Sequence, residues 1–79
     1  MDDTSYLTKD LYEASALYVS NLRFLGLDRK GSICWFVFEN KKDCLRVSNH
    51  FWAKQLRVDP KSYAEAIRTL KDRIFSAAQ

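Results

Sequence analysis

The chain contains a run of six consecutive apolar residues, Ile33-Cys34-Trp35-Phe36-Val37-Phe38. Because the side chains of a β-strand alternate between its two faces, the first, third and fifth of these point to one face and the others to the opposite face. Both faces of such a strand need cover. The run is therefore either a central strand covered on both sides by the chain's own helices, or a strand whose second face is covered by another copy of the chain or by a partner.

The size and composition of the chain favour one small folded unit. Its 79 residues are 47% hydrophobic and 14% aromatic, which is too apolar for a disordered segment. A chain of this length lies near the lower limit at which a single hydrophobic core gives a stable domain. We expect one compact domain over residues 9–76, preceded by a flexible N-terminal arm over residues 1–8.

Hydrophobic spacing and helix caps predict three helices and three strands. Helices are expected at 9–22 with Thr8 as N-cap, at 41–54 with Asn40 as N-cap and Asp43 completing the cap, and from Pro60 onward with Asp59 as N-cap. Strands are expected at 24–27, 33–38 and 55–58, and the turn before Gly31 makes the first two an antiparallel hairpin. The prediction is an α+β fold in the order α-β-β-α-β-α, with a small three-stranded antiparallel sheet that the helices can cover on both sides.

Much of this pattern resembles a small domain family of unknown function found in bacteria and phages. The resemblance covers about residues 10–75 and is carried by Asp10-Leu11-Tyr12, Gly26, Phe36-Val37-Phe38, Phe51-Trp52, Val58-Asp59 and the segment from Tyr63 to Lys71. It implies the same fold and a cytoplasmic setting in a prokaryote or virus. It implies no activity, cofactor or catalytic residue.

The two cysteines, Cys34 and Cys44, are expected as buried free thiols, with a disulfide the less favoured alternative. The first eight residues carry acidic groups and no apolar stretch, so we expect neither a signal peptide nor a membrane anchor there. No stretch approaches the roughly 20 apolar residues of a membrane span. Together these features predict a cytoplasmic protein without a membrane partner.

Residue types and spacings give no support for catalysis or for a bound cofactor. His50 is the single histidine, and it lies six residues from Cys44, on a different face of the same expected helix. Two cysteines and one histidine have no paired metal-ligand spacing, and the two glycines are isolated rather than part of a phosphate-binding loop. The prediction is a chain that is not an enzyme, with no catalytic, metal or cofactor site.

Charge is uneven along the chain. Residues 1–20 carry one lysine against four carboxylates, a net charge of −3, whereas residues 21–79 carry twelve basic and six acidic groups, a net charge of +6. The expected helix 41–54 has a basic, amide-bearing face opposite its apolar one, with Trp52 at its edge. This chemistry suits phosphates and base edges, so we predict DNA or RNA binding. The candidate residues are Lys41, Lys42, Arg46, Asn49, His50, Lys54 and Arg57.

An alternative class is a protein–protein interaction module, either a homodimer or an adaptor or small inhibitor of another protein. More apolar and aromatic side chains occur near the N-terminus than one small core obviously needs: Tyr6, Leu7, Tyr12, Tyr18 and Phe24. The first expected helix is also apolar nearly all round, from Leu11 to Val19. A two-fold dimer through that helix, or through an uncovered face of the sheet, accounts for both features.

Overall fold

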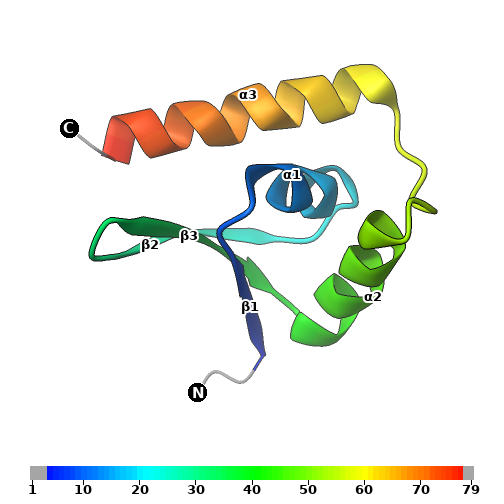
Figure 1. Ribbon diagram of the computed structural model, residues 1–79, viewed down its shortest axis with the longest axis horizontal. Helices are drawn as coiled ribbons and strands as arrows, with labels where there is room; N and C mark the ends of the chain where they lie inside the picture. The colour runs from blue at the N-terminus through cyan, green and yellow to red at the C-terminus, as the bar shows by residue number, and fades with distance from the viewer. Residues whose placement is uncertain (1–3, 78–79) are drawn as a thin grey trace.

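The computed structural model describes residues 4–77. Its elements follow one another in the order β1 (Ser5–Thr8), α1 (Leu11–Val19), β2 (Phe24–Lys30), β3 (Ile33–Glu39), α2 (Lys41–Trp52) and α3 (Pro60–Ala77) (Figure 1). The predicted class is confirmed, because the fold is α+β with three helices and one three-stranded antiparallel sheet.

The apolar run forms the central strand of the sheet, whose strand order is β1-β3-β2. Strands β2 and β3 make the predicted hairpin, and Gly31 adopts a φ of 63° in its turn. Val37 is the partner of Leu7 on one side and of Gly26 on the other. A bulge between Phe24 and Gly26 places one extra residue, Leu25, in β2.

The third strand does not lie where the sequence predicted it. Residues 55–59 have no regular secondary structure, and Ser5–Thr8 supplies the strand that pairs with the second edge of β3. The element order is therefore β-α-β-β-α-α. Leu56 packs against the core and Val58 is half-buried. The alternation of apolar and polar residues over 55–58 thus reflects the packing of side chains in the segment that connects α2 and α3. This segment does not pair with β3, whose second edge is paired with β1.

The expected N-terminal arm is wrong for residues 5–8, because they form β1. Residues 1–3 lie outside the described residues. Thr8 ends β1 and is not the N-cap of the first helix. That role belongs to Asp10, whose carboxylate accepts a hydrogen bond of 2.9 Å from the Glu13 amide. The helix ends near Asn21, where a φ of 69° breaks the helical conformation.

The other two helix starts are confirmed. The Asn40 side chain accepts from the Asp43 amide at 3.1 Å and donates to the Asp43 carboxylate at 2.8 Å. Asp59 accepts from the Ser62 amide at 2.9 Å, and these hydrogen bonds from Ser62 hold the pKa of the Asp59 carboxyl below its usual value. Helix α2 ends at Trp52, earlier than expected, and Lys54 then adopts a φ of 63°.

Within residues 4–77, the helices leave one face of the sheet without cover. Figure 1 shows α3 and α1 stacked above the β2–β3 hairpin, α2 beside them, and no helix below the hairpin. Phe36 and Phe38 point to the covered face and are 1% and 0% exposed, whereas Trp35 and Val37 on the opposite face are half-buried. Of the two alternatives for the apolar run, cover of both faces by the chain's own helices is therefore wrong for residues 4–77.

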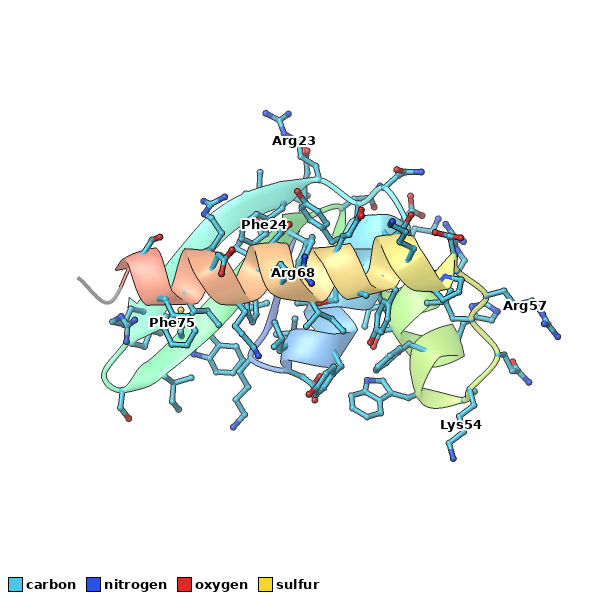
Figure 2. All side chains as sticks on the ribbon, turned by 90° about the horizontal axis from the view of Figure 1, so that it is seen from above. Arg23, Phe24, Lys54, Arg57, Arg68 and Phe75 are labelled. Atoms are coloured by element: carbon cyan, nitrogen blue, oxygen red, sulfur yellow. The ribbon has the colours of Figure 1, made fainter. Side chains whose placement is uncertain are left out.

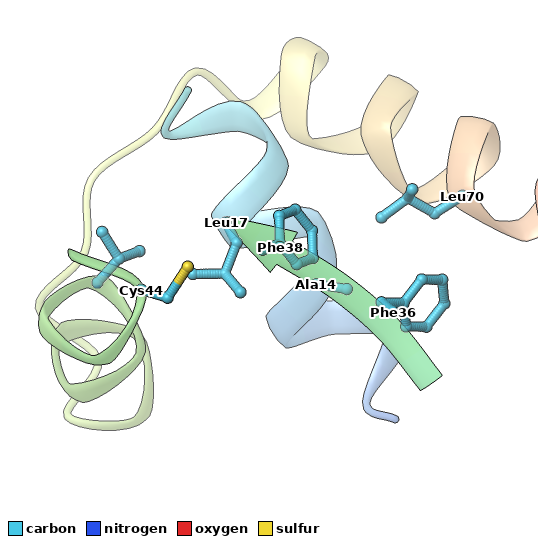
Figure 3. Packing of buried hydrophobic residues seen from close by; sticks show 7 residues of the cluster. Ala14, Leu17, Phe36, Phe38, Cys44 and Leu70 are labelled. Atoms are coloured by element: carbon cyan, nitrogen blue, oxygen red, sulfur yellow. The ribbon is translucent and has the colours of Figure 1, made fainter. Parts of the chain in front are cut away.

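The core lies between the covered face of β3 and the three helices. Figure 3 shows the two β3 phenylalanines facing α1 and, from α3, Leu70. Five consecutive residues of α1, 13–17, are buried. A helix that is apolar on most sides packs inside a fold, and the middle of α1 packs against other elements of its own chain, while Tyr12 and Tyr18 remain exposed. The core therefore accounts for residues 13–17 of α1, and a dimer through the exposed part of that helix stays a prediction.

Candidate functional site

Helix α2 presents the predicted basic face to solvent. Cys44, Val47 and Ser48 are its buried residues, and the remaining face of the helix points away from the body of the fold. All seven candidate residues are exposed: Lys41, Lys42, Arg46, Asn49, His50, Lys54 and Arg57. Figure 2 shows that Lys54 and Arg57 project outward beyond the end of α2. The charged surface therefore continues past the helix into the connection that follows.

Three of the seven candidates also line a groove of about 1110 Å³. Lys41, Lys42 and Arg46 form one side of it, and the turn between α1 and β2 forms the opposite side with Asn21 and Arg23. Asn49, His50 and Arg57 do not line this groove. The structure thus divides the predicted set into a group beside a groove and a group on the open end of the helix.

The groove carries an excess of positive charge. It is lined by four basic residues and by two acidic ones, Glu39 and Asp43. Glu39 lies 3.8 Å from Arg23, and Asp43 lies 3.2 Å from Arg46, and the side chains of both pairs are between 42% and 77% exposed. Ion pairs this exposed hold their partners weakly, so the two arginines are available to an anionic ligand.

The end of α2 adds an aromatic side chain to the basic surface. Trp52 is 59% exposed and packs edge-on against Phe51 with ring centroids 5.0 Å apart. The ring of His50 is held by its own helix, because Nδ1 lies 2.8 Å from the carbonyl oxygen of Arg46, which accepts when Nδ1 carries the proton. Lys54 borders a smaller pocket of about 250 Å³ with Phe51 and Tyr63. Apolar and basic groups therefore lie next to each other here.

A buried carboxylate with three hydroxyl partners is a feature of the structure that the residue pattern did not predict. Glu13 is 5% exposed and accepts hydrogen bonds from Tyr6 at 2.5 Å, Ser48 at 2.6 Å and Thr8 at 2.7 Å. Burial and the hydrogen bond to Glu13 raise the pKa of the Tyr6 hydroxyl. The network joins β1, α1 and α2, and no cation takes part in it within the described residues. Ser48 lies 35 residues from Glu13, and Tyr6 and Thr8 reach Glu13 from a different element, so no local spacing reveals the network.

The two cysteines differ in burial, since Cys34 is half-buried, against the expectation, and Cys44 is buried. Both are free, and the buried Cys44 thiol donates to the carbonyl oxygen of Glu39 at 3.4 Å. Burial raises the pKa of the Cys44 thiol to about 11, which keeps it protonated near neutral pH. Within residues 4–77, no three His, Cys, Asp or Glu side chains come together as metal ligands. No helix in that part of the chain is long and apolar enough to cross a membrane.

Comparison of the chain with family models, with curated proteins and with solved structures finds no match.

Proposed function

We propose that the chain is a small non-enzymatic module that binds DNA or RNA through the exposed basic face of α2. The observation that carries the proposal is the concentration of positive charge there. Residues 40–57 carry five Lys or Arg against one carboxylate, and all five basic side chains are exposed. Arg23 adds a further cation from across the groove.

The dimensions of α2 suit a nucleic-acid backbone. A helix of 12 residues is about 18 Å long. One strand of a duplex places a phosphate every 3.4 Å or so along its axis, so the basic face spans roughly five phosphates. The exposed indole of Trp52 at the end of this face is available to stack on an unpaired base.

The two basic surfaces of the chain differ in what surrounds them. On α3, Lys61, Arg68 and Lys71 are all exposed, but Glu65 and Asp72 lie among them. Their fields cancel in part, whereas Asp43 alone offsets the basic residues of α2. The α3 surface therefore makes a matched control for the α2 surface.

The test compares two variants that have the same net charge. In the first, Lys42→Gln, Arg46→Gln and Lys54→Asn neutralise the α2 face, and asparagine is chosen because position 54 has a φ of 63°. In the second, Lys61→Gln, Arg68→Gln and Lys71→Gln remove the same three charges from α3. Binding is measured by fluorescence anisotropy of labelled single-stranded and duplex oligonucleotides over a range of salt concentrations.

We expect the parent to bind, with an affinity that falls steeply as salt increases. The slope of log K against log [salt] should be about −3.5 to −4.5 for the roughly five phosphates that the face spans. The α2 variant should lose binding and most of that slope, while the α3 variant should resemble the parent. Absence of binding by the parent at low salt, or equal losses in the two variants, contradicts the proposal.

The second candidate function is a protein–protein interaction module, and the uncovered face of the sheet favours it. Of the five residues that suggested an aromatic surface, Tyr6 belongs to the Glu13 network and Phe24 packs against the core. Leu7, Tyr12 and Tyr18 remain 37%, 56% and 39% exposed. Only Leu7 lies on the open face of the sheet, where Val37 is its partner.

A further inference from the structure

We infer that the uncovered face of the sheet, here called the outer face, is the contact surface of a weak, two-fold homodimer. The inference is independent of nucleic-acid binding by α2, and it gives the second candidate function a defined partner, a second copy of this chain. It follows from the composition of the face, its charge and its size.

The centre of the outer face is apolar where a solvent-facing sheet is normally polar, and Asp28 and Lys30 of β2 border it as the partners of Trp35 and Ile33. The side chains on the covered face of β1 and β3 are those of Tyr6, Thr8, Phe36 and Phe38. Because side chains alternate along a strand, their neighbours on the same strands point to the outer face. Leu7, Leu25 and Ile33 are 37%, 49% and 39% exposed, and Trp35 and Val37 between them are half-buried. Antiparallel sheets with one face in water alternate apolar with polar residues, and β3 does not.

The bulge in β2 enlarges the apolar area. Phe24 and Leu27 pack against the core on either side of it, and the extra residue Leu25 does not. Gly26 adjoins Val37 on the outer face, and a Cβ placed on Gly26 would meet no atom within 4 Å. The face is therefore open beside Val37, where a side chain from an opposing sheet has room.

The charges at the two ends of the outer face suit a second copy of the chain as partner. At one end Lys30 lies 3.8 Å from Asp28, and at the other Arg23 lies 3.8 Å from Glu39. Both ends are neutral in sum, although the whole chain has a net charge of +3. A strongly acidic or basic partner gains nothing from such a face, whereas a copy of it meets no net repulsion.

A two-fold contact also brings complementary charges together. When two outer faces pack with their β3 strands running in opposite directions, the Arg23–Glu39 end of each chain lies over the Asp28–Lys30 end of the other. Each cation then has a carboxylate in reach across the contact. Face-to-face sheets pack about 10 Å apart with interdigitated apolar side chains, which suits the central residues of this face.

The size of the face predicts a weak dimer. A seven-residue strand is roughly 23 Å long, and three strands spaced about 4.8 Å apart are roughly 14 Å wide. The resulting area of about 300 Å² is well below the roughly 800 Å² that each partner of a standard interface buries. The apolar centre is smaller still, because the charged ends are part of this area, and a contact of this size predicts association only at high protein concentration.

The test uses sedimentation equilibrium of the full chain over a wide concentration range, up to about 1 mM. The variant is Ile33→Lys, which places a charge on the outer face at a position already exposed in the monomer. The matched control is Phe75→Lys, because Phe75 is 62% exposed on α3, away from that face (Figure 2). Urea unfolding of each variant establishes that both retain the fold.

We expect the mass of the parent to rise with concentration from the monomer value of 9.3 kDa toward twice that value and no further. Ile33→Lys should stay monomeric, and Phe75→Lys should behave as the parent. A parent that is monomeric throughout, one that grows beyond a dimer, or an Ile33→Lys variant that still dimerises overturns the inference. Binding of a monomeric parent to neutral lipid vesicles would assign the face to a bilayer instead.

The salt dependence separates this inference from the proposed function. An apolar contact survives high salt, whereas phosphate contacts are lost there. A dimer that persists at high salt in a chain that binds no oligonucleotide leaves the inference intact and removes the nucleic-acid proposal. A chain that binds the oligonucleotide but stays monomeric leaves the nucleic-acid proposal intact and removes the inference of a homodimer.

Discussion

The most informative single substitution in this fold is Ser48→Ala. Ser48 is 6% exposed on α2, and its hydroxyl donates to the buried carboxylate of Glu13 at 2.6 Å. The other contact of this hydroxyl is a longer one, 3.4 Å from the Tyr6 hydroxyl. Alanine removes one atom and leaves the helix intact. The substitution therefore isolates one of the three hydrogen bonds that stabilise a buried charge.

The expected loss follows from the energetics of charged hydrogen bonds. Such a bond contributes roughly 1.5–3 kcal/mol, more than a neutral one, because the alternative is a buried carboxylate with one partner fewer. Small domains have about 0.05–0.15 kcal/mol of stability per residue, so the loss is a large part of the total. We expect the melting temperature to fall by roughly 10 °C.

The assay is urea unfolding followed by tryptophan fluorescence, with Ser76→Ala as the control. Ser76 is exposed on α3, so its replacement should change the free energy of unfolding by less than about 0.5 kcal/mol. Repeating Ser48→Ala in a Glu13→Gln background measures the coupling, and its cost should shrink there by about 1 kcal/mol. A Ser48→Ala variant as stable as the parent, or equal costs in the two backgrounds, refutes this account of the network.

Three further predictions concern stability. Phe38→Ala should lower the free energy of unfolding by roughly 3–5 kcal/mol because Phe38 is fully buried. Trp35→Ala should lower it clearly less, because Trp35 is half-buried on the outer face. Equal melting temperatures of the two variants would contradict this placement of the two rings. Asp59→Ala should lower the melting temperature by removing the N-cap of α3, while Asp72→Ala in the exposed part of α3 should not. The pKa of Cys44 is raised from 9.0 to about 11 in the folded chain, so the unfolded chain loses this proton at lower pH than the folded chain. The free energy of unfolding should therefore be unaffected by Cys44 below about pH 9 and should fall by roughly 2–3 kcal/mol as the pH rises through 11. This fall should be absent from Cys44→Ala.

Elements with strong local signals could be predicted from the sequence. The continuous apolar run defines β3, Gly31 defines the hairpin turn, and Asn40 and Asp59 mark the starts of α2 and α3. Each of these signals acts within a few residues, through strand alternation, a positive φ or a capped amide. Local rules are therefore sufficient to place these elements.

The position of the third strand could not be predicted, because it depends on competition between distant segments. Gln55–Val58 alternates more clearly than Ser5–Thr8, yet β1 occupies the edge of β3. Two contacts that no local pattern reveals accompany β1: Tyr6 and Thr8 both donate to Glu13. These hydrogen bonds are available to Ser5–Thr8 and not to Gln55–Val58, and they stabilise the pairing of β1.

The candidate site, too, could be predicted from the sequence only in part. The exposed face of α2 follows from the helical period, which puts Lys42, Arg46 and Asn49 opposite the buried Cys44 and Val47. The groove does not follow from it, because its far wall comes from the turn between α1 and β2. The open face of the sheet was one of two alternatives for the apolar run, and only the placement of the helices decides between them.

The two proposals together predict cooperative binding to long nucleic acids. A homodimer carries two basic α2 faces, so an oligonucleotide long enough to reach both binds the second at a raised effective concentration. By linkage, the same oligonucleotide promotes dimer formation to the same extent. Titrations with a long duplex should then be sigmoidal for the parent and hyperbolic for Ile33→Lys, whereas a duplex of about ten base pairs should bind both chains equally. Equal, hyperbolic curves for both chains on the long duplex would mean that the two α2 faces of a dimer do not reach the same nucleic acid, because only simultaneous contact produces the coupling.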